Sequence, residues 1–175
     1  YDTLLEVYFD GQGYAQKDEI AQVRKYHKNP NMWDYFLRTR IAVDSLEDLL
    51  DEKEGNLDKV QMLFADMEER EEAWKELERE GVFELVGSLQ YNIEINAVGV
   101  NKGTGLVNLG KMLGIRREEI MACGDGDNDI AMLKEVGFGV AMANAEEKVK
   151  AVADYITESN NDEGVAKAIE KFVLK

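Results

Sequence analysis

The sequence predicts an α/β fold in two parts, an α+β domain in residues 1–97 and a parallel α/β domain in residues 98–175. The composition is that of a globular protein, because 45% of the 175 residues are hydrophobic and 33% are charged. Residues 91–97 alternate strictly between apolar and polar, which predicts a strand with one buried face. After residue 97, short continuous apolar runs alternate with amphipathic stretches, a pattern typical of parallel strands covered on both faces.

The first domain is predicted to mix strands and helices. Residues 4–9 form the first expected strand, and two helices begin at the capping residues Ser45 and Asp66, each followed by an acid three positions later. The second helix is expected to end at Gly81. Residues 57–65 fit a helix or a strand, and we favour a strand because Asp66 already caps the helix that follows.

A hairpin closes the first domain. Residues 83–89 alternate as residues 91–97 do, and the short separation between the two favours an antiparallel connection.

The second domain is predicted to alternate helices with buried strands. Strands are expected at residues 120–123, 138–142 and 155–157. Helices are expected at residues 103–113, 130–136, 145–151 and 163–173. We interpret the first of these as a core helix because Leu106, Leu109 and Leu113 share one face.

Charge and composition exclude several classes of partner. The chain has 36 acidic against 21 basic side chains, a formal net charge of −15 that would repel nucleic acids and anionic membranes. No apolar run approaches the length of a membrane span, and the acids near the amino end do not fit a signal peptide. With a single cysteine, Cys123, no disulfide framework is expected. We therefore expect a cytoplasmic protein.

The strongest chemical signal is the sequence Gly-Asp-Gly-Asp-Asn-Asp at residues 124–129, between a predicted buried strand and a predicted helix. Ligands of open α/β sheets bind at this edge, where glycines allow a tight turn and the next helix directs free amide groups. Three carboxylates within five residues repel one another, so they favour metal or phosphate chemistry over a purely structural turn.

Three other motifs with similar residues fail on spacing. An EF-hand counted from Asp125 would need Gly and Glu where Ile130 and Val136 stand. Residues 105–111 have the spacing of a Walker A loop, but Met112 occupies the place of the metal-binding Ser or Thr. A dinucleotide fingerprint would need a third glycine where Asp129 stands.

A second loop, residues 100–105, contains Lys102 at the start of a predicted helix, where it could reach a phosphate. Together the two loops resemble the third and fourth motifs of the haloacid dehalogenase superfamily of phosphatases, specifically its Cof-type branch. Residues 124–133 are close to that branch's signature. Further segments similar to this branch are residues 139–145, 153–155 and 160–166. The match covers residues 98–175, whereas residues 1–97 are similar only in layout to the family's α+β cap, which is inserted between the two halves of its core.

The resemblance implies a Mg²⁺-dependent phosphatase that acts on a small phosphorylated metabolite such as a sugar phosphate. In this mechanism an aspartate attacks a phosphate monoester, and water then hydrolyses the aspartyl-phosphate. Carried over by position, Lys102 and Asp129 are the catalytic residues, with Asp129 orienting the lysine or a water on the metal. Lys102 and Asn128 would bind the phosphate and Asp125 the Mg²⁺. Asp127 receives no role.

The sequence departs from the family at its first motif, Asp-x-Asp-Gly-Thr, which supplies the nucleophile and the acid/base. The two nearest sequences, residues 2–5 and 8–12, have no acid at the nucleophile position and fit cap strands better. The Ser or Thr of the family's second motif is also missing. Because the chain also begins at Tyr1, we expect a fragment, the cap plus the second half of the core, that is inactive by itself.

Two other interpretations stay open. The chain could be a catalytically inactive phosphate-binding or regulatory protein derived from the same fold, or an interaction module built on the acidic helix of residues 67–80. In the family, the strand that bears the nucleophile lies beside the strand equivalent to residues 120–123. Without it we expect an open sheet edge that leads to self-association or to loss of order in residues 98–175.

Overall fold

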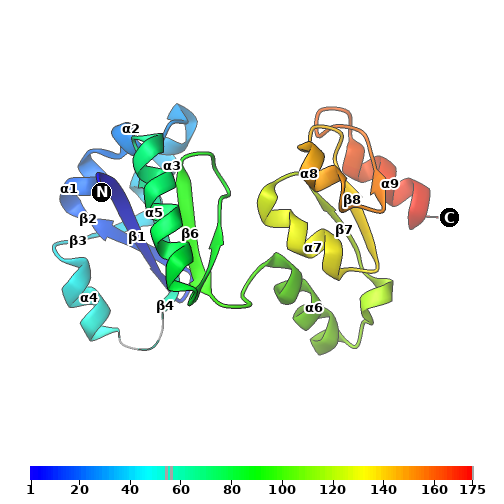
Figure 1. Ribbon diagram of the computed structural model, residues 1–175, viewed down its shortest axis with the longest axis horizontal. Coiled ribbons are helices and arrows are strands. Elements are labelled where there is room, and N and C mark those ends of the chain that lie inside the picture. Colours follow the sequence, from blue (N-terminus) through cyan, green and yellow to red (C-terminus); the bar gives the residue numbers. More distant parts are fainter. Residues whose placement is uncertain (54, 56, 175) are drawn as a thin grey trace. The chain divides into compact units, whose positions relative to one another are not determined.

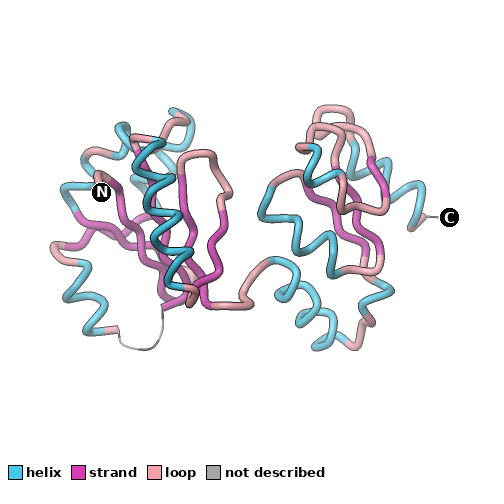
Figure 2. Tube along the Cα trace, in the orientation of Figure 1, coloured by secondary structure: helices cyan, strands magenta, loops and turns pink. Residues whose placement is uncertain are grey.

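The computed structural model describes residues 1–53, 55 and 57–174. Contacts divide the chain into two compact units, Tyr1–Val98 and Gly99–Lys175, and each is considered by itself. The α/β fold class is confirmed, because the first unit contains a six-stranded mixed sheet and the second a three-stranded parallel sheet, both with helices (Figures 1 and 2). Within the described ranges, no helix combines the length and the apolar character that a membrane crossing requires.

The sheet of the first unit has the strand order β3-β2-β1-β4-β6-β5. Its strands are β1 (Thr3–Phe9), β2 (Gln12–Gln16), β3 (Arg40–Val43), β4 (Leu57–Phe64), β5 (Phe83–Val86) and β6 (Asn92–Ala97). Within the part of this unit that the structure describes, β2 and β3 pair in parallel and the other neighbouring strands pair antiparallel. The expected strand at residues 57–65 and the antiparallel hairpin are confirmed, although the first hairpin strand ends at Val86 and not at residue 89.

A tight turn at Asp10 and Gly11 joins β1 to β2. Both residues have positive φ values, 51° and 74°, as a two-residue hairpin turn with the right twist requires. The Asp-Gly pair is a strong hairpin signal, so it could have identified β2 from the sequence.

Helices cover both faces of this sheet. On one face lie α4 (Leu46–Glu52) and α5 (Met67–Glu80), and Figure 1 shows α5 crossing the strands. The other face is covered at one end by α1 (Lys17–Ala21), α2 (Val23–Tyr26), a 3-10 turn (Pro30–Met32) and α3 (Trp33–Thr39). The predicted caps are confirmed, since Ser45 and Asp66 accept backbone N–H bonds from the first turns of α4 and α5.

A buried ion pair links two strands of the first unit that are not neighbours. Glu6 on β1 is fully buried and bonds the guanidinium of Arg40 on β3. Arg40 reaches it across β2 at Gly13, where a Cβ atom would lie 2.7 Å from the Arg40 side chain. Burial raises the pKa of Glu6, and the bond from Arg40 opposes that rise.

The second unit follows the predicted parallel pattern. Its strands, in the order β7-β8-β9, are β7 (Met121–Gly124), β8 (Phe138–Ala141) and β9 (Tyr155–Ile156). Its helices are α6 (Lys102–Leu113), α7 (Ile130–Glu135), α8 (Glu147–Lys150) and α9 (Gly164–Phe172), with 3-10 turns at Arg117–Glu119 and Asp127–Asp129.

The interpretation of α6 as a core helix is wrong for this chain. Leu109 and Leu113, expected in the core, are 51% and 64% exposed. The helix instead buries two glycines, Gly103 and Gly110. A Cβ atom on Gly103 would lie 2.8 Å from a backbone oxygen of α7, so the helices meet through a glycine and the leucines face outward. The periodicity of the sequence identified the apolar face of α6, but it could not show whether another element packs against that face.

Candidate active site

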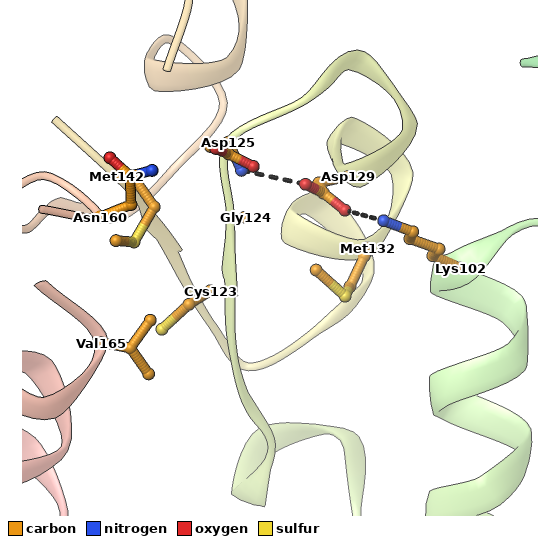
Figure 3. Close-up of a pocket in the computed structure, with 9 residues that line it drawn as sticks. All are labelled: Lys102, Cys123, Gly124, Asp125, Asp129, Met132, Met142, Asn160 and Val165. Carbon is orange, nitrogen blue, oxygen red and sulfur yellow. Dashed lines mark hydrogen bonds and ion pairs between the residues drawn. The ribbon is translucent and has the colours of Figure 1, made fainter. Parts of the chain in front are cut away.

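The candidate site lies at the carboxyl end of β7. The chain leaves the strand at Gly124, makes the 3-10 turn Asp127–Asp129 and enters α7. Gly124 must be a glycine here, because a Cβ atom on it would lie 2.5 Å from the Cβ atom of Asp129. An open pocket of about 490 Å³ adjoins this loop (Figure 3). It is lined by Lys102, Cys123, Gly124, Asp125, Asp129, Met132, Met142, Asn160 and Val165.

Asp129 organises this loop from a buried position. Its Oδ1 accepts a bond of 2.5 Å from the Lys102 ammonium, and its Oδ2 accepts the backbone N–H of Asp125 at 2.9 Å (Figure 3). The same Oδ2 accepts the backbone N–H of Gly126 at 3.0 Å. Burial by itself would raise the pKa of Asp129, but the Lys102 ammonium and the two amides outweigh it and hold the pKa below its ordinary value. Asp129 is therefore a fixed anion that joins the loop after β7 to the Lys102 side chain.

Lys102 enters the site from the first turn of α6. Asn101 caps that helix by accepting the N–H groups of Gly103 and Thr104, and the Thr104 hydroxyl accepts the N–H of Asn101 in return. This capping box fixes where the lysine leaves the backbone. The Lys102 side chain is 50% exposed while it bonds Asp129, so an ammonium with further N–H donors borders the pocket.

Each of the other two carboxylates of the loop has a polar partner. Asp125 lines the pocket, and its Oδ2 accepts the Asn144 side-chain amide at 2.8 Å. Asp127 pairs with Lys148 of α8 at 2.6 Å and is not among the residues that line the pocket. The repulsion expected among the three acids is offset by three different partners, which leaves Asp125 as the carboxylate that faces the pocket beside Asp129.

The structure brings together three of the four predicted site residues. Lys102, Asp125 and Asp129 line one pocket, whereas Asn128 is half-buried and does not belong to that lining. The predicted contact between Asn128 and a phosphate stays a prediction, as do the roles given to the other three.

Sequence reasoning missed two asparagines at the site. Asn160 lines the pocket, and Asn144 connects Asp125 to the backbone N–H of Asn160. Both follow parallel strands, as Asp125 follows β7. Their position at the same edge of the sheet is the signal that could have identified them.

Cys123 does not fit the role of nucleophile, although it lines the pocket. It is half-buried, and burial raises the pKa of its thiol, so the thiol stays protonated at neutral pH.

The donor set fits only part of a magnesium site. Within the described ranges, no group of three or more His, Cys, Asp or Glu side chains could hold a metal ion. Mg²⁺ commonly keeps several waters and binds one or two carboxylates together with a substrate phosphate. Asp125 is suited to be one such ligand. Asp129 is less suited, because its Oδ2 already accepts two backbone N–H groups and its Oδ1 accepts the Lys102 ammonium.

Known proteins resemble this chain over most of its length. The sequence profile of the haloacid dehalogenase-like hydrolases matches residues 5–169. The chain is 50% identical over 105 residues to 5-amino-6-(5-phospho-D-ribitylamino)uracil phosphatase YcsE of Bacillus subtilis, a match that covers 60% of this chain and 42% of that protein. It is 41% identical over 81 residues to the phosphoglycolate phosphatase of Methanosarcina acetivorans, covering 46% of this chain and 36% of that enzyme.

The fold also matches solved structures. A haloacid dehalogenase-like hydrolase from B. subtilis superposes with a TM-score of 0.80 at 27% identity, covering 98% of this chain and 66% of the other. The chain thus spans less than two thirds of the length of these relatives.

Proposed function

The chain belongs to the haloacid dehalogenase-like hydrolase family, and from this membership we propose that it is part of a Mg²⁺-dependent phosphatase for small phosphate monoesters. The observation that carries the proposal is the bond between Lys102 and Asp129, which joins the first turn of α6 to the loop after β7 at a pocket that Asp125 also lines. The attacking carboxylate is proposed to come from residues outside these 175, because the sequence has no Asp-x-Asp-Gly-Thr motif.

The proposed chemistry is phosphoryl transfer in two steps. A carboxylate oxygen attacks phosphorus, the bond from phosphorus to the leaving oxygen breaks, and an acid gives that oxygen a proton. Water then attacks phosphorus, which releases inorganic phosphate and restores the carboxylate. Mg²⁺ would supply positive charge that offsets the charge of the phosphate and of the attacking carboxylate.

The residues of this chain would bind and orient the reactants. The Lys102 ammonium holds a phosphate oxygen and lowers the charge that the attacking group meets. Asp129 keeps Lys102 in place and, through the N–H groups of Asp125 and Gly126, fixes the loop. Asp125 offers a carboxylate oxygen to the metal, and Asn128 donates to the phosphate.

The two units are proposed to divide the work. Residues 98–175 are proposed as the second half of the phosphatase core, and residues 1–97 as an α+β cap that selects the substrate. Two curated relatives act on phosphorylated small molecules, a phosphoribitylamino-uracil and phosphoglycolate, and we propose the same broad class here.

A pair of matched variants tests the site. In the longer protein that contains these residues, Asp125→Asn should remove most of the Mg²⁺-dependent release of phosphate from monoesters such as sugar phosphates. Asp127→Asn makes the same change in the same loop, but Asp127 bonds Lys148 and lies outside the pocket lining, so it should retain most turnover. Equal turnover of the Asp125→Asn variant and the unmodified protein would contradict the assignment.

The chain by itself should release no phosphate in that assay, because it lacks the proposed nucleophile. Release that depends on Mg²⁺ and disappears in Asp125→Asn would show that a nucleophile exists within these residues.

A second candidate function is a phosphate-binding or regulatory protein without catalysis. The pocket that Lys102 and Asp125 line is compatible with this function, which needs no attacking carboxylate. A longer protein that binds phosphate at this pocket but hydrolyses none of the monoesters would support this function over the first.

A further inference from the structure

The loops that follow three consecutive parallel strands meet at one side chain, Asn144. Its Nδ2 donates to Oδ2 of Asp125, after β7, at 2.8 Å. Its Oδ1 accepts the backbone N–H of Asn160, after β9, at 2.9 Å. Asn144 itself follows β8, so one amide joins the ends of all three strands of the sheet.

The backbone holds Asn144 where these two bonds require it. The N–H of Met142 donates to the carbonyl of Gly124, and the N–H of Ala143 donates to the carbonyl of Glu158. A further bond, from the N–H of Ala145 to the carbonyl of Met142, closes a turn around Asn144. The side chain therefore starts from a fixed backbone, and its orientation is set by bonds at both ends.

The chemistry of the two contacts selects an amide. Asp125 presents an acceptor and the Asn160 backbone presents a donor, so the side chain between them must both donate and accept. A carboxylate would repel Asp125, and a methyl group would bond neither. Because Asn144 occupies Oδ2 of Asp125, it fixes the carboxylate plane in the wall of the pocket, where Asn160 also lies (Figure 3).

We propose that Asn144 is a positioning residue, which orients the Asp125 carboxylate toward a divalent cation and ties the loop of Asn160 to the same wall. This inference rests on the proposed function, because it takes Asp125 to be a metal ligand. Groups that orient a ligand commonly contribute 10- to 100-fold to metal affinity, so the Asn144→Ala variant should bind metal at least about 10-fold more weakly.

The test uses the longer protein that contains these residues, because the proposed site takes a further carboxylate from outside them, and Mn²⁺, a paramagnetic ion that takes the same oxygen ligands as Mg²⁺. In NMR spectra of the unmodified protein, low Mn²⁺ should broaden the amide signals of residues 124–126 and 160 before those of the other acidic segments. Asn144→Ala should need about 10-fold more Mn²⁺ for the same broadening. Asn161→Ala, which removes a neighbouring exposed asparagine that does not bond Asp125, should behave as the unmodified protein does.

Hydrogen exchange separates positioning from a merely structural role. In either case Asn144→Ala should accelerate exchange of the Asn160 amide, because that amide loses its acceptor. Faster exchange with unchanged Mn²⁺ affinity would overturn the positioning role and leave the proposed function intact. Without selective broadening near Asp125 in the unmodified longer protein, both the metal site and the role of Asn144 would be refuted.

Discussion

Replacing Asp129 should destabilise the second unit, because three donors depend on this one carboxylate. Two are the backbone N–H groups of Asp125 and Gly126, and the third is the Lys102 ammonium. A hydrogen bond to a charged group contributes about 1.5–3 kcal/mol. Asp125 is exposed, so water can replace part of what the two amides lose. The pair with half-exposed Lys102 adds about 0–1 kcal/mol.

From these contributions we expect Asp129→Ala to lower the free energy of unfolding of the second unit by about 2–4 kcal/mol. The Asp129→Asn variant keeps the shape of the side chain and one acceptor oxygen. It should therefore lower the free energy of unfolding by less, about 1–3 kcal/mol. Asp127→Asn is the matched control. The pair of Asp127 with Lys148 is largely exposed, and its loss should cost no more than about 1 kcal/mol.

Hydrogen exchange of the β7 and β8 amides in urea is the appropriate measurement. Both tryptophans, Trp33 and Trp74, lie in the first unit, so tryptophan fluorescence does not report on the second. Surface substitutions ordinarily change the free energy of unfolding by no more than about 0.5 kcal/mol. If Asp129→Ala changed the free energy of unfolding of the second unit by no more than this, the reasoning would be refuted. So would an equal cost for Asp127→Asn and Asp129→Asn.

The same carboxylate predicts how stability depends on pH. The pKa of Asp129 is lower in the folded protein than its ordinary value, so the unfolded chain takes up this proton first as pH falls. The contribution of ionised Asp129 to the free energy of unfolding is complete well above a pH of about 4, the ordinary pKa of an aspartate. This contribution is lost as pH falls from there through the lowered pKa of the folded protein. In Asp129→Asn this part of the acid dependence should disappear.

Three further predictions concern the rest of the chain. Glu6→Gln should destabilise the first unit by about 3–5 kcal/mol, because it leaves the Arg40 charge without its buried partner. The measurement is a urea titration followed by tryptophan fluorescence, and a cost below about 1 kcal/mol would contradict the prediction. Asp66→Ala should cost about 1 kcal/mol in the same titration, because α5 loses its N-cap. Light scattering should show that the chain self-associates, because β7 lies at a sheet edge and Leu113 is exposed on α6. The Leu113→Lys variant should associate less. A strictly monomeric chain whose β7 amides are strongly protected from exchange would refute this prediction.

The location of the site and the elements outside residues 10–44 could be predicted from the sequence because their causes are local. Ser45 and Asp66 begin helices because their side chains bond the first amides of those helices, whatever lies around them. The loop at residues 124–129 lies at the carboxyl end of a parallel strand because buried apolar runs between helices form such sheets. Residue order therefore placed Asp125 at the carboxyl edge of the second unit's sheet.

Only the tertiary structure decided which partner each side chain takes. Asp125, Asp127 and Asp129 are the same residue type within one loop, yet they bond Asn144, Lys148 and Lys102, respectively. These partners come from segments distant along the chain, and a periodic pattern holds no information about which distant segments meet. The same limit applies to α6, whose leucines are exposed while its glycines are buried. Burial depends on what packs against a helix, and that is a property of the assembled fold rather than of the helix's own sequence.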